Sequence, residues 1–187
     1  MNRLTTLIIL FSVSLLSGCS TLNLSKQPES TQPLGSSFQL SGAIAAKNQQ
    51  HGWIANFTWV QRGRKDYQIL LNGPLGSDTI DITMHQGMLT YRQGNKVIQS
   101  NDAETLLAKE TGIRIPVSDL YDWIRGRPAP GPITSITRAP SSDDIIMLKQ
   151  AGFVIAYDKY ERHYPHKIRL EGHQLLIKIV IKHWNND

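Results

Sequence analysis

The alternation of apolar and polar residues that begins at Phe38 constrains the fold of this chain more than any other feature of the sequence. Every second residue from Trp53 to Trp59 is apolar, so these side chains would share one face of a β-strand. Every second residue from Leu175 to Ile181 is apolar in the same way. Long strands with one buried face are typical of an antiparallel sheet that packs on one side against a core. We therefore predict a mainly β fold.

Turn residues divide the other alternating segments into shorter strands. Gln86-Gly87 and Gly94-Asn95 are turn signals of the kind that joins neighbouring antiparallel strands. The strands form an early set and a late set, separated by a segment of different character. The predicted strands are 38–46, 53–60, 67–71, 78–84, 88–93 and 96–100 in the early set, and 133–138, 145–150, 153–159, 167–171 and 175–184 in the late set.

Between the two sets of strands, the apolar residues recur at the period of an α-helix. Asn101 can cap a first helix with Glu104 at its third position, and Gly112 follows its last turn. Pro116 opens a second helix, and Gly126 ends it. Two short amphipathic helices inserted midway in one curved sheet would pack across its concave face. This arrangement fits a solid core closed by a helical plug and also a cavity under a helical lid, and periodicity alone favours the plug.

The N-terminus predicts export and lipid attachment. Residues 1–3 are a short basic start, residues 4–16 are an apolar run too short for a comfortable membrane span, and Leu16-Ser17-Gly18-Cys19 resembles a lipobox. Cys19 is the only cysteine of the chain, so it cannot form an internal disulfide. By this resemblance, residues 1–18 are a lipoprotein signal peptide. Cys19 then becomes the first mature residue and carries a thioether-linked diacylglycerol and an amide-linked acyl chain.

The mature chain divides into a tether and one domain. Residues 19–37 carry the lipid and are polar and punctuated by proline, which is typical of a flexible tether. Residues 38–187 are long enough for a single domain with its own core. Ser20 follows the lipidated cysteine and is compatible with passage to the outer membrane, since aspartate at this position typically retains lipoproteins in the inner membrane.

The formal net charge of the chain is +5 at neutral pH, and the basic residues are scattered along the sequence. A scattered excess of this size usually lies on a solvated face, and it favours an anionic lipid surface only modestly. We expect no nucleic-acid partner, because the chain is exported.

Two separated segments of the chain resemble the LolB family of outer-membrane lipoprotein receptors. Residues 70–77, Leu-Leu-Asn-Gly-Pro-Leu-Gly-Ser, are similar to a strand-loop-strand of that family, although Gly73 stands where an asparagine is expected before the proline. Residues 111–126, from Thr-Gly-Ile-Arg-Ile-Pro onward, are similar to its helical segment. The lipobox, the order of elements and the last strand, which ends at Trp184-Asn185, also agree. The resemblance covers essentially the whole mature chain.

The resemblance implies an incomplete, half-open antiparallel β-barrel with short α-helices that form a lid over a hydrophobic cavity. This cavity would hold the acyl chains of cargo lipoproteins received from a soluble periplasmic carrier like LolA. The receptor would be a monomer without a cofactor, lipid-anchored in the outer membrane and facing the periplasm, and would insert its cargo into the phospholipid of the inner leaflet. The candidate cavity residues are Trp53, Phe57, Trp59, Ile69, Leu71, Ile80, Ile82, Leu89 and Tyr91 from strands and Leu106, Leu107, Leu120, Trp123 and Ile124 from helices.

Leu75 is the candidate for membrane insertion. It lies between Pro74 and Gly76 in a turn between two strands, where an apolar side chain has no obvious core to join. The residues alone fit a packed loop end equally well. The resemblance implies a leucine that projects from this loop and enters lipid. Its burial would contribute roughly 1.5–3 kcal/mol, enough to orient a domain that is already tethered.

An enzyme is the first competing class, and the sequence gives it little support. The chain contains no G-x-S-x-G elbow, Walker loop, dinucleotide fingerprint or H-E-x-x-H helix. His163 and His166 have no third ligand at a suitable spacing, so we predict no metal site. Asp78 and Asp81 would point to opposite faces of a strand, which is unsuited to paired acid-base work. We predict that the chain is not an enzyme.

A periplasmic lipoprotein of the same fold that binds free lipid or glycan is the second competing class. Such a protein would share the cavity but not the partner. The molecules that co-purify with the protein separate the two classes, because a receptor would carry triacylated polypeptide and the alternative would carry phospholipid or glycan.

Overall fold

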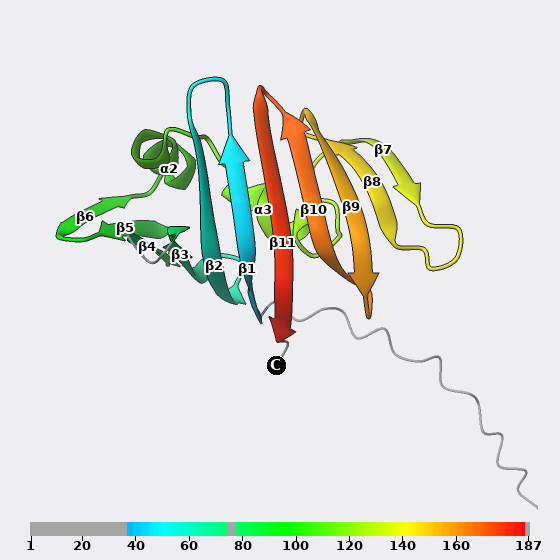
Figure 1. The fold of residues 1–187 in the computed structure, drawn as a ribbon, viewed down its shortest axis with the longest axis horizontal. Helices are drawn as coiled ribbons and strands as arrows, with labels where there is room; N and C mark the ends of the chain where they lie inside the picture. The colour runs from blue at the N-terminus through cyan, green and yellow to red at the C-terminus, as the bar shows by residue number, and fades with distance from the viewer. Residues whose placement is uncertain (1–36, 75–77, 186–187) are drawn as a thin grey trace, which may run out of the picture. The chain divides into compact units, whose positions relative to one another are not determined.

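The computed structural model describes residues 37–74 and 78–185, all within one compact unit, Leu34–Asp187. These residues form a single eleven-stranded antiparallel sheet with the order β6-β5-β4-β3-β2-β1-β11-β10-β9-β8-β7 (Figure 1). The first strand and the last are neighbours at the centre of the sheet, whereas β6 and β7 lie at its two edges. The sheet curves without closing, which confirms the predicted mainly β, half-open barrel.

The chain runs through the strands in hairpins, and a segment with two helices connects β6 to β7. The helices that the structure describes are α2 (Ala103–Thr111) and α3 (Val117–Trp123). The strands are β1 (Phe38–Lys47), β2 (Gly52–Gly63), β3 (Asp66–Asn72), β4 (Thr79–His85), β5 (Met88–Gln93), β6 (Lys96–Ser100), β7 (Ile133–Arg138), β8 (Ile145–Gln150), β9 (Phe153–Glu161), β10 (Tyr164–Gly172) and β11 (Leu175–Asn185).

Every predicted strand is present, and the largest difference lies in the hairpin of β9 and β10. β9 continues to Glu161 and β10 begins at Tyr164, several residues beyond the predicted ends. Arg162 and His163, both in the left-handed region with φ of 50° and 66°, make the tight turn between them. The two strands can therefore pair up to the turn itself. His163 lies in the connection as predicted, whereas His166 lies within β10.

The N-cap of α2 is Asp102, whereas the sequence predicted Asn101. The Asp102 carboxylate accepts a hydrogen bond from the Thr105 backbone N–H at 3.0 Å, and this bond holds the pKa of the carboxyl below its ordinary value. The hydroxyl of Ser100, the last residue of β6, accepts from the Asp102 N–H at 3.0 Å. The strand end thus holds Asp102 extended, and the helix starts one residue later. Gly112 ends α2 in the left-handed region, as predicted.

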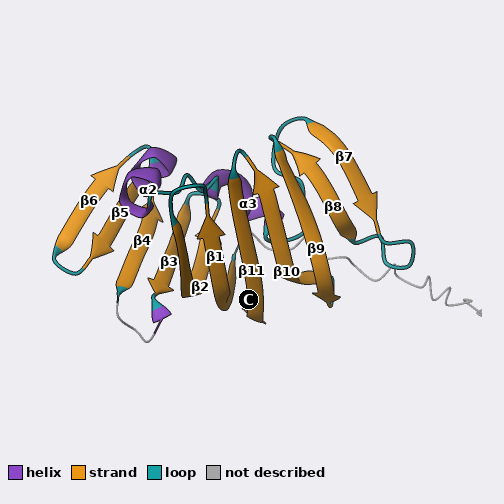
Figure 2. Cartoon of the chain, turned by 45° about the horizontal axis from the view of Figure 1, so that its top comes forward, coloured by secondary structure: helices purple, strands orange, loops and turns teal. Residues whose placement is uncertain are grey.

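The helices lie against one face of the curved sheet (Figure 2). The helices and this concave face share one hydrophobic core. Its buried members include Leu106 and Leu107 of α2, Leu120 of α3, Ile124 just after α3, and Ile177 of β11. The alternation of the strands and the helical period of the helices both point their apolar residues into this core. The helices therefore lie across the concave face, as the sequence predicts.

The two central strands approach each other closely at one glycine. A Cβ atom on Gly42 of β1 would lie 2.0 Å from the carbonyl oxygen of Val180 in β11. The register of the two strands shifts between Ser41 and Gly42, which marks a bulge. Because a side chain cannot fit at this position, glycine allows the first and last strands to pair and to make the concave face continuous across the centre.

Candidate functional site

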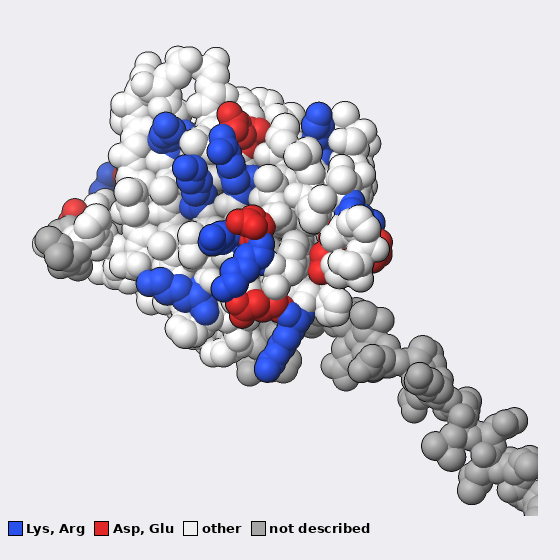
Figure 3. Space-filling view, turned by 45° about the vertical axis from the view of Figure 1, so that its right-hand side comes forward, with Lys and Arg blue, Asp and Glu red and all other residues white. Residues whose placement is uncertain are grey.

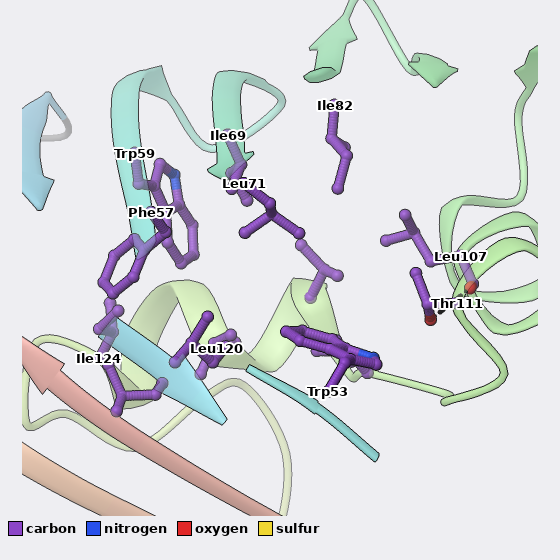
Figure 4. Close-up of a pocket in the computed structure, with 14 residues that line it drawn as sticks. Trp53, Phe57, Trp59, Ile69, Leu71, Ile82, Leu107, Thr111, Leu120 and Ile124 are labelled. Carbon is purple, nitrogen blue, oxygen red and sulfur yellow. Dashed lines mark hydrogen bonds between the residues drawn. The ribbon is translucent and has the colours of Figure 1, made fainter. Parts of the chain in front are cut away.

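An apolar cavity lies between the concave face of the sheet and the helical segment (Figure 4). Its volume is about 50 Å³. We call it the central cavity, and its lining consists of Ile44, Trp53, Phe57, Trp59, Ile69, Leu71, Ile82, Leu107, Thr111, Ile115, Val117, Leu120, Ile124 and Ile179. Strands from both halves of the sheet and both helices contribute to it, so this space can form only in the folded chain.

Most of the cavity residues predicted from the sequence are brought together here. Trp53, Phe57, Trp59, Ile69, Leu71, Ile82, Leu107, Leu120 and Ile124 line the central cavity. Ile80 and Tyr91 line an adjoining pocket instead. Leu89, Leu106 and Trp123 are buried in the core and line neither of these two spaces.

Trp123 shows why a buried aromatic residue need not face the cavity. Its ring packs against Phe153 of β9, with 5.5 Å between the ring centroids. Its Nε1–H donates a hydrogen bond to the Gln150 side chain at 2.9 Å. Both partners belong to the late strands, so this residue turns toward β8 and β9 and away from the central cavity.

Five lining residues were missed by sequence reasoning. Ile44 and Ile179 lie directly opposite each other in the register of β1 and β11. Both belong to alternating apolar faces that the sequence shows, but alternation does not tell which strands lie beneath the helices. Ile115, Val117 and Thr111 complete the lining from the helices and their connection.

Two further spaces share Trp53 with the central cavity. The side pocket has a volume of about 300 Å³ and is lined by Trp53, Ile54, Ala55, Leu71, Gly73, Pro74, Asp78, Ile80, Tyr91, Gln93, Glu110 and Thr111. The rim groove has a volume of about 670 Å³ and is lined by Ala45, Ala46, Lys47, Gly52, Trp53, Ile54, Pro74, Leu176 and Lys178. Trp53 lines all three spaces and therefore stands where they meet.

A cluster of charged side chains ties α3 to the early strands. The Asp122 carboxylate lies 2.7 Å from the guanidinium of Arg64, which comes from the β2–β3 hairpin, and 3.0 Å from that of Arg125. The Arg125 guanidinium also lies over the Tyr121 ring, 3.9 Å from its centroid. Asp122 and Arg125 are buried, and the Arg64 side chain is half exposed. The buried charges are paired, as burial requires, and the Arg64 contact joins the helix to the hairpin.

The buried side-chain amide of Gln150, in β8, holds the segment after α3 to the late strands. The Gln150 carbonyl oxygen accepts hydrogen bonds from Trp123 Nε1 and from the Ala129 backbone N–H, both at 2.9 Å. The Gln150 amide nitrogen donates to the Ala129 carbonyl oxygen at 2.7 Å. These bonds use both ends of the side chain, which is 2% exposed. The chain that leaves α3 is thus fixed to β8.

Basic side chains gather on the opposite face of the sheet, with acidic side chains between some of them (Figure 3). Lys178 and Lys182 of β11 are exposed, and they make no ion pair with the residues that the structure describes. Lys178 lies opposite Arg169 in the register of β10 and β11, and Arg169 is paired with Glu171 at 2.7 Å. Like charges on opposing residues are destabilising unless solvent or an anion screens them. This patch is therefore suited to contact with an anionic surface.

Three predicted site residues, Cys19, Leu75 and Gly76, lie outside the described residues. Pro74 is described and exposed, and it lines both the side pocket and the rim groove. In the ranges 37–74 and 78–185, no helix has the length and apolar character needed to cross a membrane. The same ranges contain no group of three or more metal-ligating side chains placed to hold an ion.

Comparison with protein families gives a match over most of the chain. A family model described as outer membrane lipoprotein LolB matches residues 36–184. Relatives with the name outer-membrane lipoprotein LolB include one from Cellvibrio japonicus, 32% identical, with 98% of each chain covered. Another, from Coxiella burnetii, is 30% identical over 94% of this chain and 90% of its own. A third, from Stutzerimonas stutzeri, is 33% identical over 79% of this chain and 73% of its own.

Comparison with solved structures finds the same architecture in a distant protein. A LolA superfamily protein from Nitrosomonas europaea matches 83% of this chain and 87% of its own, with a TM-score of 0.50 and 11% sequence identity. At this identity the likeness concerns the fold alone. It shows that the open sheet with its inserted helices is an architecture that another chain also adopts.

Proposed function

We propose a function for this chain from one premise: the chain belongs to the LolB family of outer-membrane lipoproteins. As a member of this family, it is an outer-membrane lipoprotein receptor that acts in lipoprotein localisation. Within that function, we propose that it accepts lipoproteins from a soluble LolA-like carrier of the periplasm and inserts them into the inner leaflet of the outer membrane. It acts as a monomer, and no catalytic step enters the proposal.

The proposed receptor has a lipid anchor, a tether and one binding domain. Residues 1–18 are the signal peptide, residues 19–37 carry the lipid on Cys19 and form the tether, and residues 38–187 are the lipoprotein-binding domain. The lipobox-like sequence and the proline-punctuated segment after it support this arrangement. The domain then faces the periplasm and stays close to the membrane into which it delivers.

The observation that carries the proposal is the apolar lining that sheet and helices share. Hydrocarbon side chains suit acyl chains, whereas a glycan requires convergent hydrogen-bonding groups, which this lining lacks. Acyl chains cross water only at a large cost, since each methylene contributes about 0.8 kcal/mol when buried. Transfer from a carrier to this cavity needs no nucleotide if the receptor binds the chains more favourably than the carrier does.

The small volume of the central cavity implies that it must open to be filled. Ligand pockets typically measure roughly 300–1,000 Å³, and the central cavity measures about 50 Å³. The side pocket, at about 300 Å³, adjoins it at Trp53, Leu71 and Thr111. We propose that acyl chains enter as the helical segment, α2 together with α3, moves away from the sheet, so that the central cavity and the side pocket become one space.

Transfer from a loaded carrier tests the proposed function directly. Purified receptor should strip a triacylated lipoprotein from its soluble carrier without nucleotide, and an apolar dye bound to the receptor should be displaced as the cargo arrives. Cargo that stays with the carrier, or a receptor that takes up only free phospholipid, would assign the cavity to the alternative class of lipid-binding lipoproteins.

The Arg64–Asp122 contact should slow this opening. Arg64→Ala removes the contact between α3 and the β2–β3 hairpin, while Asp122 keeps Arg125 as its partner. A partly exposed ion pair is worth up to about 1 kcal/mol, so cargo should load roughly two- to fivefold faster in stopped-flow dye displacement. Arg62→Ala is the matched control, because Arg62 lies in the same hairpin and pairs with Asp66 instead. Equal loading rates in both variants would show that this contact does not limit entry.

The rim groove supports the proposed phospholipid contact. Ile54 is 63% exposed, the largest exposure of any bulky apolar side chain that the structure describes. Lys47 and Lys178 line the same groove, together with Pro74. An apolar side chain flanked by lysines suits the boundary between acyl chains and anionic headgroups. We propose that this rim faces the membrane, and that Leu75, which follows Pro74 in the sequence, enters it.

A further inference from the structure

Trp53 differs from the other tryptophans in the hydrogen bonding of its ring. Its Nε1 atom is buried and has no acceptor among the residues that the structure describes. The other three ring nitrogens each donate to the protein: Trp59 to Gln61 at 2.6 Å, Trp123 to Gln150 at 2.9 Å, and Trp184 to the Pro165 carbonyl oxygen at 3.1 Å. A buried N–H group without an acceptor is rare in proteins, and it calls for a physical reason.

The position of Trp53 supplies that reason. The side chain lines the central cavity, the side pocket and the rim groove, so it stands on the path between the apolar cavity and the proposed membrane-facing rim. In Figure 4 the nitrogen atom of the Trp53 ring lies at the end of the ring that is nearer to Thr111. Thr111 lines the central cavity and also the side pocket, whose lining includes the polar residues Gln93 and Glu110. Trp53 therefore marks the boundary where a mainly apolar lining gives way to a mixed one.

Two polar neighbours in the side pocket, Gln93 and Glu110, already have partners, and the carboxylate of Asp78, which lines the same pocket, makes no hydrogen bond with the Trp53 ring nitrogen. The Gln93 carbonyl oxygen accepts a hydrogen bond from the Tyr91 hydroxyl at 2.8 Å. The Glu110 carboxylate accepts one from the Lys96 ammonium group. The Trp53 N–H is a donor only. Among the described residues it meets no acceptor, so it can donate to one that a ligand brings.

We propose that Trp53 Nε1–H donates a hydrogen bond to the carbonyl oxygen of a glycerol acyl ester. This inference rests on the proposed function. A ligand whose acyl chains lie in the central cavity has its first hydrogen-bond acceptors at the ester groups where the chains end. Those esters come to lie at the boundary that Trp53 marks. The bond fixes how deep the chains sit, and it selects ester-linked lipid over simple hydrocarbon. Such esters belong both to the diacylglyceryl group of cargo and to membrane phospholipid.

Chemically matched ligands test this assignment. A synthetic lipopeptide with an ester-linked S-diacylglyceryl cysteine and its ether-linked analogue, which lacks the carbonyl oxygens, compete with an apolar dye for the full-length receptor. Trp53→Phe keeps most of the ring and removes the N–H. It should weaken binding of the ester lipopeptide roughly three- to tenfold more than binding of the ether analogue, which is the range of one neutral hydrogen bond. A parallel pair of diacyl and dialkyl phospholipids shows whether cargo, phospholipid or both supply the ester.

Trp59→Phe is the matched control. Trp59 lines the same cavity, but its N–H is already bound to Gln61, so this variant should change ester and ether binding by the same factor. Equal effects of Trp53→Phe on both linkages, or no effect on either, would overturn the assignment while leaving the receptor function intact. A wild-type protein that binds neither lipopeptide would overturn the receptor function and this inference together.

A measurement on the wild-type protein guards against a variant that folds poorly. The indole N–H resonance of Trp53, identified in ¹⁵N-labelled protein by its loss in Trp53→Phe, reports directly on the bond. It should shift downfield when the ester lipopeptide binds and stay near its free position with the ether analogue. The same shift with both ligands would contradict the proposal, because it would not depend on the carbonyl oxygen.

Discussion

Replacing Cys19 by alanine is expected to move the receptor from the membrane to the soluble periplasmic fraction. Each buried methylene contributes about 0.8 kcal/mol, and two or more acyl chains make attachment stable where a single chain gives only marginal binding. What remains is one inserted leucine, worth roughly 1.5–3 kcal/mol, and lysines worth about 1 kcal/mol each near an anionic surface. The membrane-bound fraction should therefore fall more than about tenfold, measured by flotation of cell envelopes.

The design of this variant must separate lipidation from processing. An alanine at position 19 can leave residues 1–18 uncleaved, so these residues are replaced by an ordinary cleavable secretory signal in the variant. Ser20→Ala, which keeps the cysteine and the native signal, is the matched control and should float with the membrane. The soluble variant should still accept cargo from the carrier. Quantitative flotation of the cysteine-free protein would show that another part of the chain anchors it.

The fold could be predicted from the sequence because alternation and helical period report which residues face a core. The strand that starts at Leu175 is predicted correctly for this reason. The end of α2 is predicted correctly because Gly112 readily adopts the left-handed conformation that ends a helix. The sequence predicts the end of β9 too early and the start of β10 too late. Neither apolar alternation nor a glycine marks the turn at Arg162 and His163. The exact cap of α2 depends on Ser100, whose hydroxyl accepts a hydrogen bond from the Asp102 backbone N–H and holds Asp102 extended.

The cavity could be predicted only in part, because periodicity assigns a residue to a face and not to a place on it. Ile44 and Ile179 share a register pair that forms when the first and last strands meet, a contact between distant parts of the chain. Trp123 has the pattern of a core residue, and its partner Gln150 decides where the ring lies. The Arg64–Asp122 contact likewise joins residues far apart in sequence, and no local pattern predicts it.

The unpartnered ring of Trp53 illustrates the same limit at the level of chemistry. In sequence, Trp53 and Trp59 are equivalent members of one alternating strand face, and both line the central cavity. Only the structure shows that one ring nitrogen has Gln61 as its acceptor and that the other has none among the described residues. The proposed role of Trp53 depends on whether its buried N–H group has an acceptor. Neither composition nor periodicity can predict this.

Replacing Leu75 by glutamate is expected to separate receiving cargo from delivering it. The variant loses an apolar side chain that we propose enters lipid, and it adds a charge that resists leaving water. The central cavity is lined by other residues, so loading from the carrier should persist. Insertion should fall by roughly tenfold or more, since lost burial of 1.5–3 kcal/mol alone corresponds to a factor of that order. The assay loads the purified variant, adds liposomes and measures the cargo that floats with them.

Two further variants show whether position and apolar character both matter for delivery. Leu75→Ala loses burial without adding charge, so its insertion should lie between that of the wild type and that of Leu75→Glu. Val97→Glu places the same charge on an exposed apolar position, 57% accessible, in β6 and outside the rim groove, so it should insert cargo as the wild type does. Equal flotation of cargo in all four proteins would remove Leu75 from the membrane step. A loss of loading in Leu75→Glu would place this leucine in the cavity or in the fold, because a residue that acts only at the membrane cannot affect the transfer that precedes it.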